Sequence, residues 1–541
     1  MKSASTYAAT AAAALVLAAP ALAATGPSTT QSPYVTPRAP GVTTTSILSV
    51  GDGVGGYRMA GVPDGLGAFD NGDGTFTVLM HHELRPTVGI RRDHNQGLPA
   101  TDPLTGSPTA GGAYISKWVI NKSNFQVQSG EDLIKTVNEW NGSTYVPTDT
   151  RVFNRFCSAD LAPLSGLSFT QNGTTLGTTE RLFMGGEETN AGKAYATVVS
   201  SGAAYQLPKL GTYAFENVLV NPASQMKTIV AGMDDSDNVT SFAPVTVDGD
   251  RPSEVYFYVG QKTQAANPVE AAGLNNGQLF GVKVDGVLGE DQMNGIGGKK
   301  SFSLAAVNPA QDELGLQNES IDKGVTQFLR VEDGAWNPTN ASEFFFTTTD
   351  QFSEVKEGTG PQEGRSRLWK MTFADIANPE LGGTIEALLD GTEPHQMLDN
   401  MDVDSKGRIV LQEDPGNQPH NAKIWMYDPT TDALTLLAGH DVARFGDNGM
   451  AATAPFTQDE ESSGIIDVSE ILGEGWYLLD VQAHRSTPFD PALTQELVEG
   501  GQLIAMHVGN AAAVPVPAAV LIAPAAMGVA GLAARRMRKG N

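Results

Sequence analysis

The chain has almost no cysteine: Cys157 is the single one in 541 residues. One cysteine cannot form an intramolecular disulfide, so the fold must be held together without one. The commonest state of a free cysteine is a buried structural thiol. The polar, turn-rich neighbours of Cys157 in NRFCSADLAP (154–163) favour a metal-binding thiolate instead.

Positive charge is also scarce. Lysine and arginine number 35 against 61 acidic residues, which gives a formal net charge of −26. This balance excludes a nucleic-acid-binding protein, because a phosphate backbone requires a basic surface. The acidic excess is compatible with calcium ligation by carboxylates and equally with simple solubility outside the cell.

Familiar catalytic motifs and long helical patterns are missing. The sequence has no G-x-S-x-G elbow, Walker loop or H-E-x-x-H helix. Glycine (60) and proline (31) divide the chain into short strand-like runs at 74–80, 181–186, 254–260, 343–349, 407–412 and 475–482. These runs predict an all-β fold, a six-bladed β-propeller with irregular insertions. A pair of β-sandwiches is the alternative, since the spacing is irregular.

The two ends of the chain predict export. Residues 1–24 are typical of a secretory signal peptide, and their apolar run is too short for a good membrane span. A Ser/Thr/Pro/Gly-rich linker (25–45) and a body (46–510) follow. Residues 511–541 combine VPVPAA, an apolar stretch and a basic end, and resemble a PEP-CTERM-type sorting signal. That resemblance implies processing by an exosortase-like enzyme, with membrane contact only through this segment before processing. A simple tail anchor is the alternative. Both place the body outside the cytoplasm, in the periplasm, at the cell surface or beyond.

Polar or acidic residues follow each strand-like run, at 81–83, 186–188, 260–262, 348–350, 412–414 and 482–484. In a propeller, equivalent strand ends converge at one mouth of the central channel. Carboxylates that meet there repel one another unless cations bind, so the pattern predicts a metal site at this mouth. Solvated turn residues are the alternative interpretation.

Several motifs, in this order, resemble the PhoX-type bacterial alkaline phosphatases. They are His81-His82-Glu83, the complete C-S-x-x-L-A-P element at 157–163, Glu187-Glu188, Glu216 in GTYAFENVLV, and the complete R-x-E-D-G-x-W element at 330–336. The resemblance covers about residues 45 to 490. It implies a six-bladed propeller with an iron and calcium cluster at the channel mouth. It also implies hydrolysis of small phosphate monoesters, with a metal-bound oxygen as nucleophile.

The resemblance also implies roles for individual residues. Cys157 would bind iron and Arg330 would bind the phosphate. The glutamates that would bridge iron and calcium are Glu83, Glu187, Glu188, Glu216 and Glu332. We add Asp333, Asp399, Glu413 and Asp414 as further candidate calcium ligands. The oxygen-rich stretch Asp234–Asn238 is more typical of a solvated loop than of a calcium site, because it lacks the EF-hand glycine and terminal glutamate.

The chain also departs from the family pattern. Gly260-Gln261-Lys262 stands where the family has an acidic strand end, His82 where it has asparagine, and Phe215 where it has histidine. These differences leave open a calcium-dependent phosphodiesterase or phytase-like hydrolase. They also leave open a non-catalytic, calcium-stabilised surface propeller. We expect a monomer in each case.

Overall fold

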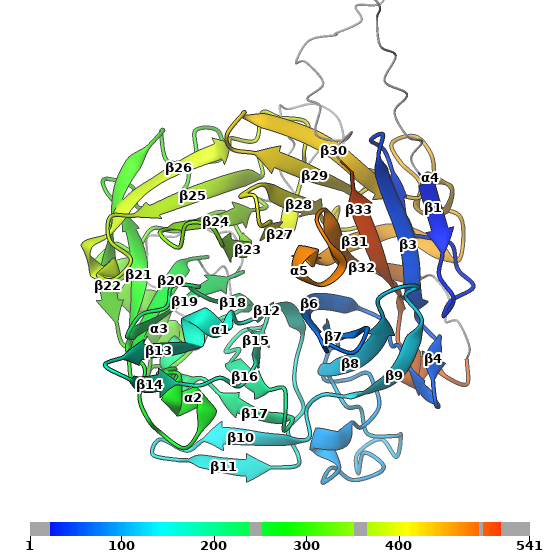
Figure 1. Cartoon of the computed structure of the whole chain (residues 1–541), viewed down its shortest axis with the longest axis horizontal. Coiled ribbons are helices and arrows are strands. Elements are labelled where there is room, and N and C mark those ends of the chain that lie inside the picture. The colour runs from blue at the N-terminus through cyan, green and yellow to red at the C-terminus, as the bar shows by residue number, and fades with distance from the viewer. Residues whose placement is uncertain (1–21, 237–251, 351–364, 486–490, 510–541) are drawn as a thin grey trace, which may run out of the picture.

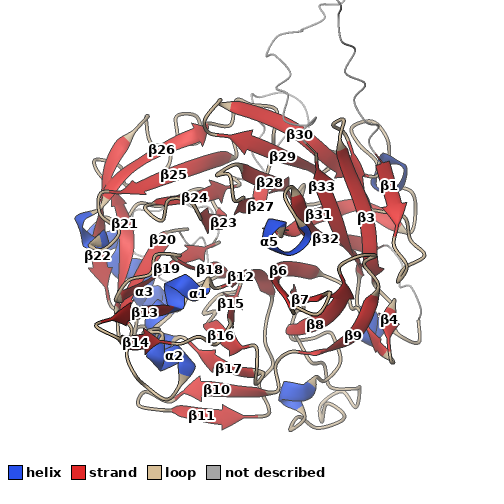
Figure 2. Ribbon diagram, in the orientation of Figure 1, coloured by secondary structure: helices blue, strands red, loops and turns tan. Residues whose placement is uncertain are grey.

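A computed structural model describes residues 22–236, 252–350, 365–485 and 491–509. These residues are mostly in β-strands, as Figure 2 shows, so the predicted all-β class is confirmed. No helix in the described ranges is long and apolar enough to cross a membrane. Most of the predicted signal peptide (1–21) and all of the C-terminal segment (511–541) lie outside the described residues.

The strands form antiparallel meanders that surround a common centre (Figure 1). The first meander consists of β6 (Pro63–Asp70), β7 (Thr75–His82), β8 (Tyr114–Asn121) and β9 (Val127–Asp132). The second consists of β12 (Phe156–Leu161), β15 (Leu182–Glu187), β16 (Ala194–Val198) and β17 (Ala203–Gln206), with β10 (Thr136–Trp140) and β11 (Tyr145–Thr148) at its outer edge.

The third and fourth meanders are joined at their outer edges into one sheet through β22 and β26. The third consists of β18 (Phe215–Val220), β19 (Lys227–Asp234), β20 (Val255–Gln261), β21 (Gln278–Val284) and β22 (Lys300–Val307). The fourth consists of β23 (Val331–Trp336), β24 (Glu343–Thr348), β25 (Arg367–Phe373) and β26 (Gly383–Leu389).

The last two meanders take in strands from the start of the chain. The fifth consists of β27 (Leu398–Val403), β28 (Ile409–Glu413), β29 (Lys423–Asp428), β30 (Ala433–His440) and β2 (Val35–Pro37). The sixth consists of β31 (Phe456–Asp467), β32 (Trp476–Arg485), β33 (Gly500–Val508), β3 (Val42–Ser49) and β1 (Leu22–Thr25).

The remaining elements are small. Two short hairpins pair β4 (Gly53–Val54) with β5 (Tyr57–Arg58) and β13 (Ser168–Gln171) with β14 (Thr174–Gly177). The helices are α1 (Leu164–Leu167), α2 (Pro268–Ala271), α3 (Glu313–Lys323), α4 (Val442–Phe445), α5 (Ser469–Leu472) and α6 (Thr494–Leu497). Among these helices of the described residues, α3 alone exceeds one turn. It starts at an Asp312 cap, whose carboxylate accepts from the backbone N–H of Gly315, and ends at Gly324 in a left-handed conformation.

The core lies between neighbouring meanders. Every residue of β7 is buried, because both faces of the strand are covered. Leu79 of β7 packs in one cluster with Phe183 of β15, and Met184 of β15 packs in another with Tyr256 of β20. Strands that are covered on both faces read as near-continuous apolar runs, which is why the sequence showed them so clearly.

The start and end of the described chain meet in the sixth meander. There β3 pairs with β33, with Thr44 opposite Met506, and β1 lies parallel to β3. The predicted linker at 25–45 is therefore wrong: these residues supply β2 and the start of β3. Tyr34 and Val35 are buried in the cluster between the fifth and sixth meanders. The Ser/Thr-rich composition of this segment suggested a linker, but threonine is also common in strands, and the Thr-rich β3 pairs with β1 and β33.

Candidate metal centre

The innermost strands of the meanders are β6, β12, β18, β23, β27 and β31, and each contacts the next so that the six close a ring. Each carries a β-bulge, at which two of its residues face one residue of the neighbouring strand. The bulge pairs are Asp64-Gly65, Cys157-Ser158, Glu216-Asn217, Glu332-Asp333, Asp399-Asn400 and Gly464-Ile465. The same local irregularity is thus repeated around the centre.

The first bulge residue has a metal-ligand side chain in five of these six strands. We call these five the bulge ring: Asp64, Cys157, Glu216, Glu332 and Asp399. All five are at most 8% exposed. The second bulge residues all line a separate cavity of about 330 Å³. The bulge therefore directs two adjacent side chains to different places.

A second group of acidic residues follows the second strand of several meanders. The group consists of Glu83, Glu188, Asp235 and Asp414. The backbone N–H of each donates to the carbonyl of the residue just before an inner strand: Val62, Arg155, Ala214 and Met397 respectively. We call this group the strand-end acids. The predicted recurrence of acidic groups at equivalent strand ends is present in these four meanders.

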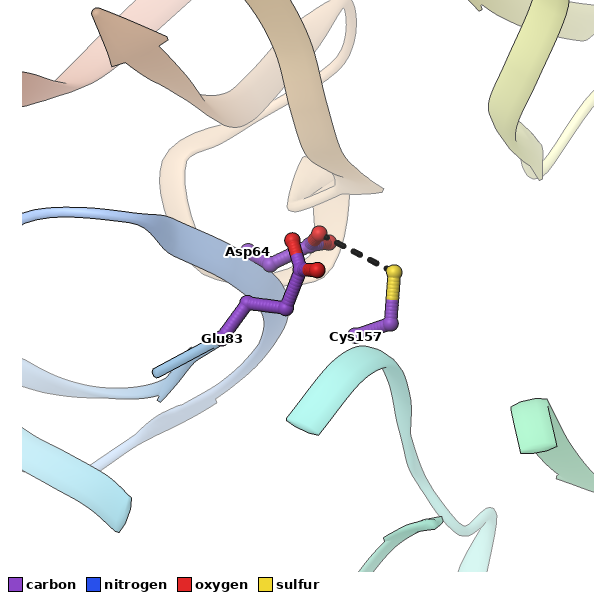
Figure 3. A group of neighbouring side chains, drawn as sticks. All are labelled: Asp64, Glu83 and Cys157. Carbon is purple, nitrogen blue, oxygen red and sulfur yellow. Dashed lines mark hydrogen bonds between the residues drawn. The ribbon is translucent and has the colours of Figure 1, made fainter. Parts of the chain in front are cut away.

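Ligand atoms from both groups come within 4.8 Å of one another in three overlapping sets: Asp64, Glu83 and Cys157; Cys157, Glu188 and Glu216; and Glu216, Glu332 and Asp399. Figure 3 shows the first set, in which the carboxylates of Asp64 and Glu83 face the sulfur of Cys157. The Cys157 thiol donates to Asp64 Oδ2 over 3.3 Å. Cys157 and Glu216 each belong to two sets, so the three sets form one continuous cluster.

Two arginines border this cluster. Arg155 Nε donates to Glu83 Oε1 at 2.6 Å, and its Nη2 lies 2.6 Å from Glu188 Oε2. Arg330 binds both oxygens of Asp235 and also contacts Glu332 Oε1 at 3.0 Å.

Each arginine directly precedes an inner strand and has a positive φ, +46° for Arg155 and +59° for Arg330. Such a conformation is costly for a non-glycine residue. Val62 and Met397, which directly precede β6 and β27, also have positive φ, so the conformation belongs to the start of several inner strands. The two side chains remain 35% and 21% exposed, so both can meet a ligand from solvent.

The electrostatics of the cluster show an excess of buried negative charge. Burial, followed by repulsion from Asp64 and Glu216, raises the pKa of the Cys157 thiol. Burial raises the pKa of Glu188 to about 8 even though Arg155 opposes the shift. Burial and the charge of Glu216 raise the pKa of Asp399. The charged forms of these ligands need more positive charge than the two arginines supply.

The residues fit a mixed metal cluster. Asp399 Oδ1 is buried and has no hydrogen-bond partner in the described part of the chain. An orphaned buried carboxylate oxygen is expensive unless a cation binds it. The two sets that contain Cys157 combine sulfur with oxygen and suit a transition metal, whereas the set of Glu216, Glu332 and Asp399 offers only oxygen and suits a hard cation.

Three predicted ligands lie outside these sets: Glu187, Asp333 and Glu413. Glu187 Oε2 pairs with Arg151 at 2.5 Å. Asp333 Oδ1 accepts from Asn217 Nδ2 at 2.6 Å and lines the separate cavity. Glu413 accepts from His420 Nε2 at 2.7 Å and from Trp425 Nε1 at 2.8 Å. Each is one of two adjacent acidic residues, and neighbours on a strand point to opposite sides.

The remaining predicted residues lie at the cluster. Cys157, Glu83, Glu188, Glu216, Glu332 and Asp399 belong to the three sets, and Arg330 contacts Glu332. Asp414 lies at the edge of the cluster, where its charge helps to raise the pKa of Asp399. His81 is outside the three sets: its Nδ1 lies 2.9 Å from the Cys157 carbonyl oxygen, and burial lowers its pKa to about 4.

The sequence pattern places Gly260-Gln261-Lys262 at the strand end where the family has acidic residues, but the structure shows that a different strand end is equivalent. These residues end β20, the third strand of their meander, which runs antiparallel to β19. Lys262 therefore lies at the other end of the sheet, where its Nζ donates to the Lys227 carbonyl. The equivalent strand end is Asp234-Asp235, and Asp235 holds Arg330. The interpretation of 234–238 as only a solvated loop is wrong for this residue.

Sequence reasoning missed Asp64, Arg155 and Gln482 as well. Asp64 lies in VPDGLG, which is typical of a turn, because the bulge is invisible in a local pattern. Gln482 was visible as a polar strand end, but not as the amide that donates to Asp64 Oδ2, Glu83 Oε2 and Glu461 Oε1. Arg155 and Arg330 both directly precede an inner strand, so a comparison of these equivalent positions would have identified Arg155.

No protein-family model matches the chain, and no curated protein matches it in sequence. Among solved structures, PhoX of Pseudomonas fluorescens in complex with vanadate, a transition-state analogue, is similar with a TM-score of 0.56 and 11% identity. The alignment covers 88% of this chain and 96% of that chain. A protein of unknown function from Dyadobacter fermentans has a TM-score of 0.40 and 9% identity, over 87% of this chain and 100% of that one. The first similarity establishes that this chain and PhoX share a fold.

Proposed function

We propose that the chain is a six-bladed β-propeller that hydrolyses small phosphate monoesters at a metal centre in the mouth of its central channel. The observation that carries the proposal is the bulge ring, in which five inner strands direct one thiol and four carboxylates to a common cluster. The closed ring of inner strands and the fold shared with PhoX support the propeller.

Each group at the centre has a role in this proposal. Iron at Cys157 and calcium at the carboxylates would supply, when bound, the positive charge that polarises a phosphate ester. Arg330 and Arg155 would bind the phosphoryl oxygens, because a guanidinium offers paired N–H donors that match phosphate. Asp235 and Glu332 hold Arg330 in place before substrate arrives. Positioning and charge neutralisation of this kind are the main requirements of phosphoryl transfer.

The proposed setting is outside the cytoplasm. It rests on the export pattern of residues 1–24 and the sorting pattern of residues 511–541. We propose a monomer whose substrate is a small soluble phosphate ester, because the two arginines reach solvent at the edge of the cluster.

The test combines metal analysis with turnover. Purified protein loaded with iron and calcium should contain both metals and release p-nitrophenol from p-nitrophenyl phosphate. Cys157→Ser should lose iron and most activity, whereas Asp160→Asn, a half-buried change on the same inner strand but outside the three sets, should lose neither. Metal content without turnover of any phosphate ester would contradict the enzymatic proposal. Hydrolysis of bis-p-nitrophenyl phosphate with calcium alone would favour a calcium-dependent diesterase.

A further inference from the structure

The sixth inner strand departs from the bulge ring. In β31 the first bulge residue is Gly464, where the other five inner strands have an acidic residue or cysteine. Gly464 has a φ of +59°, a conformation that glycine adopts without strain. The bulge of the sixth inner strand therefore supplies no ligand side chain.

The side chain of Asp480 occupies the space that Gly464 leaves. A Cβ on Gly464 would lie 3.0 Å from Asp480 Oδ1 and 2.8 Å from the carbonyl oxygen of Asp64. Asp480 comes from the neighbouring strand β32, where it is paired with Ser463. A carboxylate from the second strand thus lies next to the position that the missing bulge side chain would take, near the backbone carbonyl of Asp64.

Both acidic residues have oxygens without partners. Asp480 is 0% exposed, and neither of its oxygens has a hydrogen-bond partner among the described residues. Asp64 is also 0% exposed; its Oδ2 accepts from Cys157 and Gln482, while its Oδ1 has no described partner. No described lysine, arginine or histidine forms an ion pair with Asp480. Three buried carboxylate oxygens are thereby left unsatisfied, which folding does not tolerate cheaply.

We propose that Asp64 and Asp480 bind a further cation beside the main cluster, with Asp64 bridging the two. Its Oδ2 faces Cys157 in the cluster, which leaves Oδ1 for the second cation. The site offers only oxygen donors, including the Asp64 carbonyl, so its ligand is a hard divalent cation of the calcium class. Its role is to complete the ring at the sixth strand, and this role does not depend on phosphate-ester hydrolysis.

The test is calcium binding by the purified protein, measured by equilibrium dialysis and by melting temperature with and without calcium. Asp480→Asn should bind about one calcium fewer per chain and should keep its iron. The rise in melting temperature on adding calcium should also shrink. In chelator, Asp480→Asn should be at least as stable as the wild type, because it removes an unpartnered buried carboxyl. Asp160→Asn, a half-buried inner-strand change outside this pair, should bind calcium like the wild type.

An unchanged calcium count together with an unchanged calcium-dependent melting shift in Asp480→Asn would overturn the proposal. An Asp480→Asn chain that fails to fold even in chelator would also contradict it, because Asp480 would then be needed without any cation. Diffraction from wild-type crystals in saturating calcium gives an independent measurement. Anomalous density between Asp64 and Asp480 is expected, and its absence would count against the site whatever the protein does to phosphate esters.

Discussion

At the scale of single residues, the site depends on which of two adjacent side chains faces the cluster. Glu188 and Glu332 belong to the metal-ligand sets, whereas their neighbours Glu187 and Asp333 make hydrogen bonds elsewhere. Arg330 and Arg155 share the same position before an inner strand and the same positive φ. Whether an acidic residue can act as a ligand here therefore depends on its position in the bulge or at the strand end, and not on its charge alone.

We predict that Arg330→Lys lowers kcat/KM for p-nitrophenyl phosphate by about 10- to 100-fold, because lysine keeps the charge but not the bidentate geometry. The melting temperature should change little, since an ion pair to Asp235 can still form. Steady-state kinetics and thermal melting measure both effects. Arg58→Lys is the matched control, because Arg58 pairs with Glu496 at the surface. Equal activity of Arg330→Lys and wild type would remove the phosphate-binding role.

At the scale of elements, the bulged inner strands approach one another closely. A Cβ on Gly65 of β6 would lie 2.3 Å from the backbone nitrogen of Ala159 and 2.5 Å from the Ser158 carbonyl carbon in β12. This contact is backbone to backbone, so neither strand can yield by turning a side chain. The small second bulge residue of the first meander is thus required by the ring itself.

Gly65→Ala should destabilise the fold by about 1–3 kcal/mol or more, because the added methyl overpacks the β6–β12 contact. Gly72→Ala provides the comparison: its Cβ would meet nothing within 4 Å, but its φ is +77°, so it should cost only about 1 kcal/mol. Urea unfolding of both variants measures the difference. A smaller loss in Gly65→Ala than in Gly72→Ala would show that the inner strands can separate.

A buried glutamate on β31 should make stability depend on pH. Burial raises the pKa of Glu460 to about 9, and His440 beside it stays neutral because burial lowers its pKa to about 3. The folded protein then holds a proton that the unfolded chain releases above its ordinary pKa of 4.5. Stability from this group is full below pH 4.5 and decreases as the pH rises towards 9, by at most about 1.4 kcal/mol per unit.

Glu460→Gln should flatten this dependence. Melting temperatures at pH 5 and pH 8.5 should differ less in the variant than in the wild type, with the variant gaining relative stability at the higher pH. Parallel pH profiles for the two proteins would show that Glu460 titrates normally in the folded state.

At the scale of the whole molecule, the ring closes by pairing the two ends of the chain. Strand β3 joins β33 and β32 in the sixth meander, so residues more than 450 positions apart in sequence share one sheet. Figure 1 shows this junction as the blue and red strands that lie side by side. The pairing covers the edge of β33, whose backbone N–H and C=O groups would otherwise be unpaired.

Deleting residues 22–50 should therefore abolish cooperative unfolding of the whole ring, and not only loosen one edge. Replacing the β13–β14 hairpin by a short Gly/Ser loop is the control, because this two-stranded sheet is separate from the meanders. Thermal melting followed by near-ultraviolet circular dichroism distinguishes the two. A sharp transition near the wild-type temperature in the truncated chain would show that the remaining meanders do not need closure.

The sequence by itself determined the all-β class, because strands that are covered on both faces appear as apolar runs. Its motifs also identified most of the residues at the cluster, namely Cys157, Glu83, Glu188, Glu216 and Arg330. It could not identify Asp64, Asp235 or Asp480, nor separate Glu188 from Glu187. Those assignments depend on where each bulge shifts the register and on which strand is second in its meander. Both are properties of pairing between distant segments, so only the tertiary structure decided which side chains meet at the centre.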